Sequence, residues 1–375
     1  MKLIKLISRI LLGITFVFSG FVKGIDPWGS AYKFTDYFEA FGWEALVVTA
    51  LPLAFILSYA EFIIGIALLF NLHTKRSAGP ALLFMLFFTP LTLYIALNNP
   101  VSDCGCFGDA LKLTNWQTFY KNLVFIALAI ITFRNRKQFH SILNGKLQTT
   151  VLLFFTVVFT ILSYVSFNHL PLIDFRPYAE GVNINESMAV PADAQKPVYE
   201  NIFHYKNLKT GQVKQFTEQN YPWQDTLNWK FEKMDEPRLI TPGYVPPINN
   251  FSIETADGND VKDFFLDEDN YTFFYIAYDL SKASDKSMKT IRELIKYCNE
   301  KNYNFIGLTA SLQNEIDAFK AQHQLQFDFL FTDPITLKTM VRSNPGLMLT
   351  KKGTIVKKWH FNDFPSINSL EKVIK

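Results

Sequence analysis

The sequence predicts a membrane protein with two regions: an α-helical transmembrane bundle of four helices plus a fifth, followed by an α/β domain. Hydrophobic residues make up 49% of the 375 residues and include 37 Phe, whereas charged residues make up only 19%. The long apolar runs lie in residues 1–169, which carry a formal charge of +6, while residues 170–375 carry −3. So much apolar surface excludes a disordered chain. The nearly neutral total of +3 gives no reason to expect nucleic-acid binding.

Five segments are long and apolar enough to cross a lipid bilayer, since a spanning helix needs about 20 mostly apolar residues. The first segment starts with basic residues, as a signal peptide does, but Gly20 and the residues after it offer no small-x-small cleavage site. We therefore expect a retained helix. The predicted bundle covers residues 1–140 and the fifth helix lies within 141–169. The five segments are 3–22, 45–70, 78–97, 119–133 and 149–167.

The basic residues that flank these segments predict the orientation, because cytoplasmic flanks are enriched in Lys and Arg. Nine lie on the side of the N-terminus: Lys2, Lys5, Arg9, Lys75, Arg76, Arg134, Arg136, Lys137 and Lys146. Four lie on the other: Lys23, Lys33, Lys112 and Lys121. The N-terminus is therefore expected in the cytoplasm of a bacterium. Five spans of the inner membrane then place residues 170–375 in the periplasm.

Two of the three cysteines, Cys104 and Cys106, flank Gly105 in a loop predicted on the periplasmic side. Such a pair can close into a small, strained disulfide ring, and strain makes a disulfide easier to reduce. A redox-active pair is the favoured interpretation. A static disulfide, or two reduced thiols with a structural or weak metal-binding role, are the alternatives. No metal is predicted, because two thiolates without a neighbouring His make a poor site.

Glu61 is an acidic residue in the middle of the second apolar segment. A carboxylate at membrane depth is costly and points to function. The alternative is a protonated Glu61 that bonds to a neighbouring helix, with Ser58, Thr89 and Thr92 as candidate hydroxyl partners.

Three stretches carry a family resemblance. Residues 18–27 (FSGFVKGIDP) and 60–69 (AEFIIGIALL) resemble the first and second helices of the DoxX family. Residues 103–108 (DCGCFG) resemble the loop of the related MauE proteins, which are linked to disulfide formation in a periplasmic enzyme. Over residues 1–140 the resemblance implies a four-helix bundle with a quinone- or thiol-linked redox role, and a quinone as cofactor.

The segment 170–245 is rich in Pro, Asn and aromatic residues and is predicted as a β-rich segment or extended linker, either a spacer or a docking surface. Its expected strands are 199–205, 212–216 and 226–231, with a hairpin turn at 208–211.

Residues 246–375 alternate strands and helices in an order that resembles the thioredoxin fold of the TlpA type. Pro345 falls where that fold has its cis-proline. The expected strands are 271–277, 304–309, 346–350 and 354–359, and the expected helices are 284–300, 315–323 and 366–374.

This domain lacks the redox motif of thioredoxins. Ser281 and Ser284 occupy the spacing of the two cysteines, and a hydroxyl cannot exchange disulfides. One of these serines is expected to cap a helix. The predicted role of the domain is partner binding, in a groove at Ser281, Ser284 and Pro345. Cys298, on the apolar face of a helix, is expected to be an inert buried thiol.

Two functions follow. The first is an inner-membrane thiol-redox protein in which Cys104 and Cys106 exchange electrons with a periplasmic protein or small thiol and pass them to a quinone. Glu61 would handle protons or face the quinone, and the C-terminal domain would hold the partner. The alternative is a non-enzymatic membrane scaffold or assembly factor of an envelope complex, which the loss of the C-x-x-C motif favours.

Overall fold

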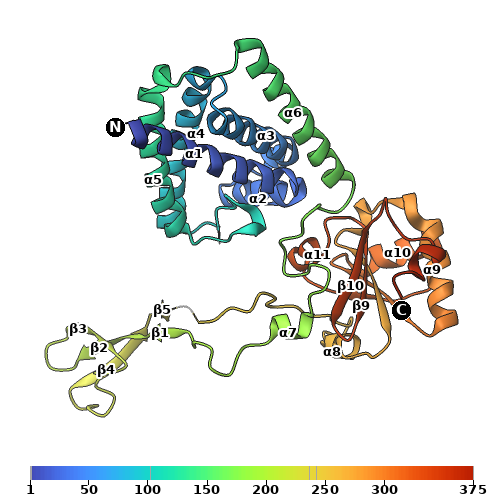
Figure 1. The fold of residues 1–375 in the computed structure, drawn as a ribbon. Coiled ribbons are helices and arrows are strands. Elements are labelled where there is room, and N and C mark those ends of the chain that lie inside the picture. The colour runs from blue at the N-terminus through green and yellow to red at the C-terminus, as the bar shows by residue number, and fades with distance from the viewer. Residues whose placement is uncertain (1, 102, 236, 242, 375) are drawn as a thin grey trace. The chain divides into compact units, whose positions relative to one another are not determined.

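The computed structural model describes residues 2–101, 103–235, 237–241 and 243–374. The chain forms two compact units, which Figure 1 colours along the chain. One unit comprises Met1–Val182 and Phe251–Lys375, and the other comprises Asn183–Asn250. The larger unit contains a helical apolar region followed by a β-rich region.

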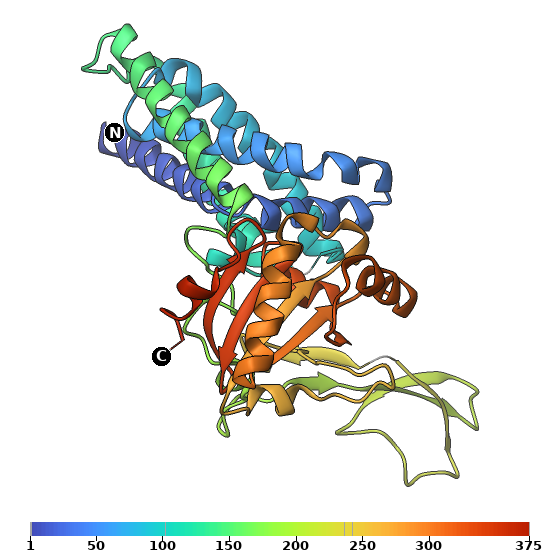
Figure 2. The same ribbon diagram turned by 90° about the vertical axis from the view of Figure 1, so that its right-hand side faces the viewer.

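Within the described residues, five helical stretches are long and apolar enough to cross a membrane, which confirms the five predicted spans. Two pairs, α1 with α3 and α4 with α5, make the most extensive helix contacts, and α6 packs beside α3 (Figures 1 and 2). The second stretch, Glu44–Leu69, starts as a 3-10 turn before α3. The helices are α1 (Lys2–Gly24), α3 (Ala50–Leu69), α4 (Thr74–Asn98), α5 (Asn115–Arg134) and α6 (Gly145–Asn168).

Helices α1 and α3 approach each other closely because small residues line their contact. A Cβ atom on Gly20 would lie 2.4 Å from the backbone nitrogen of Phe62, so no larger residue fits there. Small residues allow the backbones of membrane helices to meet in this way. The close approach brings Ser19 and Lys23 of α1 up to α3.

A further helix, α2 (Pro27–Ala40), follows α1 and was not predicted. Its start is well specified: Asp26 caps the helix by accepting a hydrogen bond from the Gly29 N–H at 2.9 Å, and Pro27 occupies the first turn. Both residues favour a helix start. The segment between the first two spans is therefore ordered rather than an open loop.

The β-rich region of the larger unit is a five-stranded sheet with the strand order β10-β9-β6-β7-β8. The strands β6, β7 and β8 are parallel, whereas β9 runs antiparallel to β6 and β10 antiparallel to β9. Every residue of β6 is buried. The strands are β6 (Tyr271–Ala277), β7 (Asn304–Thr309), β8 (Phe329–Phe331), β9 (Gly346–Lys351) and β10 (Thr354–His360).

Helices cover this sheet, and they agree with the predicted ones except at the C-terminus, where α12 has four residues. The strand β8 and the short helix α8 were not predicted. Cys298 of α9 is fully buried, and burial raises the pKa of its thiol to about 12. The helices are α8 (Lys262–Leu266), α9 (Met288–Lys301), α10 (Gln313–His323), α11 (Pro334–Met340) and α12 (Ile367–Leu370).

The segment 170–182 packs on the sheet instead of belonging to the strand-rich unit. Asp174 pairs with the buried side chains of Arg176 (2.7 Å) and Lys358 of β10 (2.5 Å). Burial opposes ionisation of Asp174, but the two cations outweigh it and lower its pKa to about 2. The strand-rich unit therefore begins later in the chain than the predicted segment 170–245.

The smaller unit consists of a short helix, a two-stranded pair and a three-stranded antiparallel sheet with the order β3-β2-β4. Tyr205 packs edge-on against Phe216 and Phe231 across the three strands. The predicted strand 199–205 is divided into β1 and β2, the predicted strands 212–216 and 226–231 correspond to β3 and β4, and β5 was not predicted. The elements are α7 (Ile184–Met188), β1 (Val198–Glu200), β2 (Ile202–Asn207), β3 (Val213–Thr217), β4 (Trp229–Met234) and β5 (Arg238–Thr241).

Candidate active site

The two loop cysteines lie side by side. We call residues 103–111 the thiol loop. Cys104 Sγ and Cys106 Sγ are 2.7 Å apart, and both residues are half-buried. Gly105 between them has a φ of +64°, a left-handed conformation that favours glycine. Its N–H donates to Asp103 Oδ1 at 2.8 Å. This local turn brings both sulfur atoms together.

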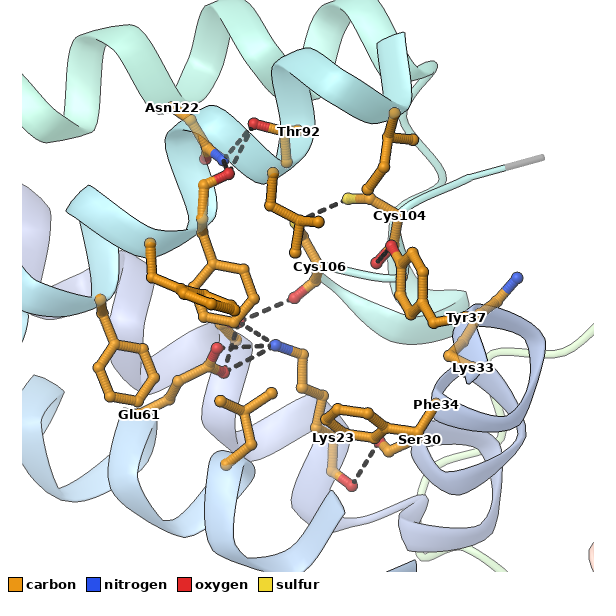
Figure 3. Close-up of a pocket in the computed structure, with 18 of the residues that line it drawn as sticks. Lys23, Ser30, Lys33, Phe34, Tyr37, Glu61, Thr92, Cys104, Cys106 and Asn122 are labelled. Atoms are coloured by element: carbon orange, nitrogen blue, oxygen red, sulfur yellow. Dashed lines mark hydrogen bonds and ion pairs between the residues drawn. The ribbon is translucent and has the colours of Figure 1, made fainter. Parts of the chain in front are cut away.

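Helix α2 holds the thiol loop in place. The Tyr37 hydroxyl donates to the carbonyl oxygen of Cys104 at 2.9 Å, and Lys33 Nζ lies 3.0 Å from Asp103 Oδ2 (Figure 3 labels Lys33 and Tyr37). Burial disfavours the Lys33 ammonium, but the Asp103 carboxylate outweighs this effect and raises the pKa of Lys33. Helix α2, which was not predicted, thus supports the loop that carries the two thiols.

The two thiols differ in acidity. The hydrogen bond from the Cys106 thiol stabilises the Cys104 thiolate and, with smaller contributions from Thr118 and Lys121, lowers the pKa of Cys104 to about 6. Donating that bond, together with burial, raises the pKa of Cys106 well above its usual range. In the reduced protein Cys104 is therefore the more acidic thiol of the pair, and acidity favours the reactive thiolate form.

Glu61 is paired, not isolated. Lys23 Nζ lies 2.8 Å from both carboxylate oxygens of Glu61 (Figure 3). The Ser19 hydroxyl lies 2.8 Å from Glu61 Oε2 and also 2.8 Å from the carbonyl oxygen of Cys106. Since a hydroxyl has one proton, Ser19 donates to one of these oxygens at a time. A polar chain therefore joins the carboxylate to the thiol loop.

The predicted hydroxyl partners of Glu61 are wrong. Ser58 donates to the Ala54 carbonyl of its own helix, and Thr92 donates to the Phe88 carbonyl at 2.8 Å. Thr89 Oγ1 has no hydrogen-bond partner among the described residues. Ser and Thr commonly satisfy their hydroxyls on the preceding helical turn, which leaves the carboxylate to the lysine.

A cavity of about 790 Å³ lies in the bundle beside these groups. Its lining includes both cysteines, the Glu61–Lys23 pair, and Asn122, which donates to Thr92 at 3.1 Å (Figure 3). The rest of the lining is predominantly apolar. It includes exposed side chains of α3 and α4, namely Ile56, Leu86 and Phe87. Its size is that of a small-molecule site, and its side between α3 and α4 presents apolar residues.

Two of the three predicted groove residues of the sheet region, Ser284 and Pro345, are brought close together through Asn344. The Ser284 N–H donates to the Asn344 carbonyl at 3.0 Å, and Asn344 Nδ2 donates to the Asp279 carbonyl at 2.7 Å. The Asn344–Pro345 peptide bond is cis, as expected. Ser284 caps the 3-10 turn Asp285–Ser287, whereas Asp279 caps the turn that contains Ser281. Pro345 is buried and Ser281 is exposed.

Three site residues were missed from the sequence: Ser19, Lys23 and Tyr37. Ser19 and Lys23 stand four residues apart and so share one helix face, which is a signal that was available. No such signal marks Tyr37. Across the described residues, no group of three or more His, Cys, Asp and Glu side chains is arranged to hold a metal ion.

The helical region, with its thiol pair and buried ion pair, has known relatives. Residues 1–134 match the family of the methylamine utilisation protein MauE. This match confirms the MauE resemblance for the membrane region and indicates a bacterial membrane protein in a redox or methylamine-utilisation context. The MauE-like region contains Cys104, Cys106 and Glu61. Residues 199–240 match a domain of unknown function (DUF8463). No curated protein and no solved structure matches the chain.

Proposed function

We propose that this chain is a quinone-linked thiol-disulfide oxidoreductase of the bacterial inner membrane, with Cys104 and Cys106 as its reacting groups. The observation that carries the proposal is that the thiol pair lines an apolar cavity of about 790 Å³ together with a buried Glu61–Lys23 pair. The MauE-like region supports a redox context.

The reaction has two balanced steps. A periplasmic dithiol first attacks the Cys104–Cys106 disulfide, whose S–S bond breaks while a disulfide forms in the client. The reduced pair then reforms its disulfide and releases two electrons. Cys106 loses its proton in this step, while Cys104 is already ionised. A bound quinone would accept the two electrons and two protons, so the second proton must reach the cavity by another route. The Lys23–Glu61–Ser19 cluster supplies such a route.

The cavity suits a quinone for two reasons. Its lining is mostly apolar, and exposed residues of α3 and α4 open it to a hydrophobic molecule in the bilayer. Its polar lining includes Lys23, Glu61, Asn122 and Thr92, together with Thr15, Ser19, Ser30, Lys33, Tyr37 and Lys121. An apolar pocket with a few convergent polar groups is typical of a small-molecule site.

The sheet region is proposed to be a thioredoxin-like domain that binds a periplasmic protein partner without redox chemistry. Support comes from three parallel strands flanked by an antiparallel pair, with α9 following the central strand β6. Ser281 and Ser284 replace the cysteines, and Cys298 is fully buried. This loss of chemistry also favours the second candidate, a non-enzymatic scaffold or assembly factor.

One experiment separates the two candidates. The full-length protein, reduced and held in detergent, is mixed with a short-chain ubiquinone, and the free thiols are counted by mass tagging. The oxidoreductase loses the thiols of Cys104 and Cys106 while one quinone is reduced per pair. A Cys298→Ala variant should behave identically. If both thiols stay free after addition of the quinone and also in aerobic cells, the oxidoreductase is excluded and the scaffold function remains.

The client and the orientation have separate tests. In a Cys106→Ala variant the Cys104 thiolate attacks a client disulfide, and the mixed disulfide cannot be resolved, so the client stays attached for identification. A C-terminal alkaline phosphatase fusion should be active and a fluorescent-protein fusion dark, if the sheet region is periplasmic. The reverse pattern would contradict the proposed orientation.

A further inference from the structure

Arg342 joins the sheet region to two separate segments of the helical region. It lies in the turn between α11 and β9. Its Nε is 3.0 Å from Asp26 Oδ2, and its Nη2 is 3.0 Å from Asp109 Oδ2. Asp26 is the cap of α2, and Asp109 belongs to the thiol loop. One guanidinium therefore bridges the supporting helix and the loop that carries both cysteines.

The bridge is enclosed. Only 6% of the Arg342 side chain is exposed. Its guanidinium lies over the Tyr32 ring of α2 at 5.4 Å, and Tyr32 meets the Tyr278 ring of the sheet region edge-on at 6.5 Å. Lys338 lies over both rings. Two carboxylates and an aromatic face surround the planar guanidinium, and arginine binds such surroundings with specificity.

Helix α2 contacts both the sheet region and the thiol loop. The beginning of α2 meets the sheet region through Asp26 and Tyr32, and the following turn holds the thiol loop through Lys33 and Tyr37. Arg342 also holds the loop directly through Asp109. A displacement of the sheet region would break the contact of Arg342 with Asp109 in the loop and its contact with Asp26, the cap of the supporting helix, at the same time.

We propose that docking of the sheet region through Arg342 keeps the thiol loop closed over the cavity, so that an external thiol reaches the Cys104–Cys106 pair only after these contacts open. Tyr278 and Arg342, which lie close in sequence to the predicted groove residues Ser281 and Pro345, contact the helical region of the same chain. Arg342 is a positioning residue. The inference rests on the proposed function in taking Cys104 and Cys106 as the reacting groups.

The first arm of the test measures docking. In a full-length Cys104→Ser/Cys106→Ser protein, Tyr32→Cys and Tyr278→Cys are joined by a short bifunctional thiol reagent. We expect efficient crosslinking, a fall of about fivefold or more on adding Arg342→Ala, and partial recovery with Arg342→Lys. Crosslinking that does not respond to Arg342→Ala would overturn the docking role.

The second arm measures access to the thiol. With the wild-type loop reduced, pulse labelling by a membrane-impermeant maleimide should modify Cys104, the more acidic thiol of the pair, about tenfold faster in Arg342→Ala than in the parent. Asp109→Asn removes one of the two ion pairs and should give a smaller increase, which covers the case that Arg342→Ala does not fold. Lys282→Ala removes an exposed cation of the same region and should have no effect.

Equal labelling rates in the parent, Arg342→Ala and Asp109→Asn would refute the closed loop. Neither arm uses a quinone. If the proposed function fails, quinone leaves the thiols reduced while both arms still give the expected results. If this inference fails and the proposed function holds, quinone still oxidises the Cys104–Cys106 pair, but Arg342→Ala changes neither the crosslinking nor the maleimide labelling.

Discussion

Lys23 of α1 places its ammonium 2.8 Å from both carboxylate oxygens of Glu61 in α3, and the two side chains are only 11% and 9% exposed. A charge pair at this depth needs good geometry and further hydrogen bonds to offset its desolvation. Ser19 provides one such bond. The pair therefore places two opposite charges beside the thiol loop and adds no net charge of its own.

Glu61→Gln tests this pair. The substitution keeps the side-chain shape but leaves Lys23 buried without its counter-charge, which costs about 3–5 kcal/mol of stability when a buried pair is broken. We expect a lower Tm in detergent and loss of quinone-dependent thiol oxidation.

Glu44→Gln is the matched control, because Glu44 is an exposed residue at the start of the second span. It should leave both measurements unchanged. A Glu61→Gln protein that oxidises its thiols at the parent rate would exclude a role for the carboxylate in the reaction.

The pH dependence of alkylation tests the thiol assignment. With the pKa of Cys104 at about 6, its alkylation rate should rise with pH and reach half its maximum near that pH. Cys106→Ala removes the hydrogen bond that lowers this pKa, so the midpoint should move upward, toward the usual value of about 8.5. Labelling at pH 6.5 should then slow by about tenfold or more. A midpoint that stays near 6 would mean that other groups ionise Cys104.

Gly105→Ala tests the turn between the cysteines. At a φ of +64° an L-residue is strained by about 1–2 kcal/mol, and the new Cβ would lie 3.0 Å from Lys33 Cγ. The loop should shift, separate the sulfur atoms and slow disulfide formation, which mass tagging after a quinone pulse measures. Gly108→Ala controls for a substitution in the same loop, because it too has a positive φ but an open surrounding. Equal slowing in both variants would point to backbone strain alone.

Ser281→Cys/Ser284→Cys tests the thioredoxin-like interpretation. In a full-length protein without the loop thiols, the double variant should form a reducible disulfide, because the two positions have the spacing of a C-x-x-C motif. The parent of that variant should show none, since its single remaining cysteine, Cys298, is buried. Two new thiols that stay reduced in an oxidising glutathione buffer would argue against the proposed alignment.

Features with a strong local pattern were predicted from the sequence. The five spans follow from runs of apolar residues, and strand β6 follows from a continuous buried run at Tyr271–Ala277. Cys298 was placed on an apolar helix face, and it is fully buried. Each of these depends on neighbours in the chain, and hydrophobic periodicity reports such neighbours well.

Features that depend on distant contacts were not predicted. The partner of Glu61 is 38 residues away, and Arg342 lies 233 residues beyond Asp109. Hydroxyls closer to Glu61 in sequence were the natural candidates, but the helix backbone satisfies Ser58 and Thr92. Helix α2 was missed because its 14 residues carry only a weak periodic apolar pattern, although Asp26-Pro27 marks its start.

The strand-rich unit enters the larger unit as an insertion. The larger unit's chain stops at Val182 and resumes at Phe251, and the rings of Tyr178 and Phe251, which flank the break, lie 6.0 Å apart. Since the two cut points are near neighbours, evolution can lengthen, exchange or delete the 68 intervening residues (Asn183–Asn250) without reshaping either the bundle or the sheet. Domain insertions succeed at such surface points. The length and surface of this segment can thus change while the thiol loop and the contacts that support it stay intact.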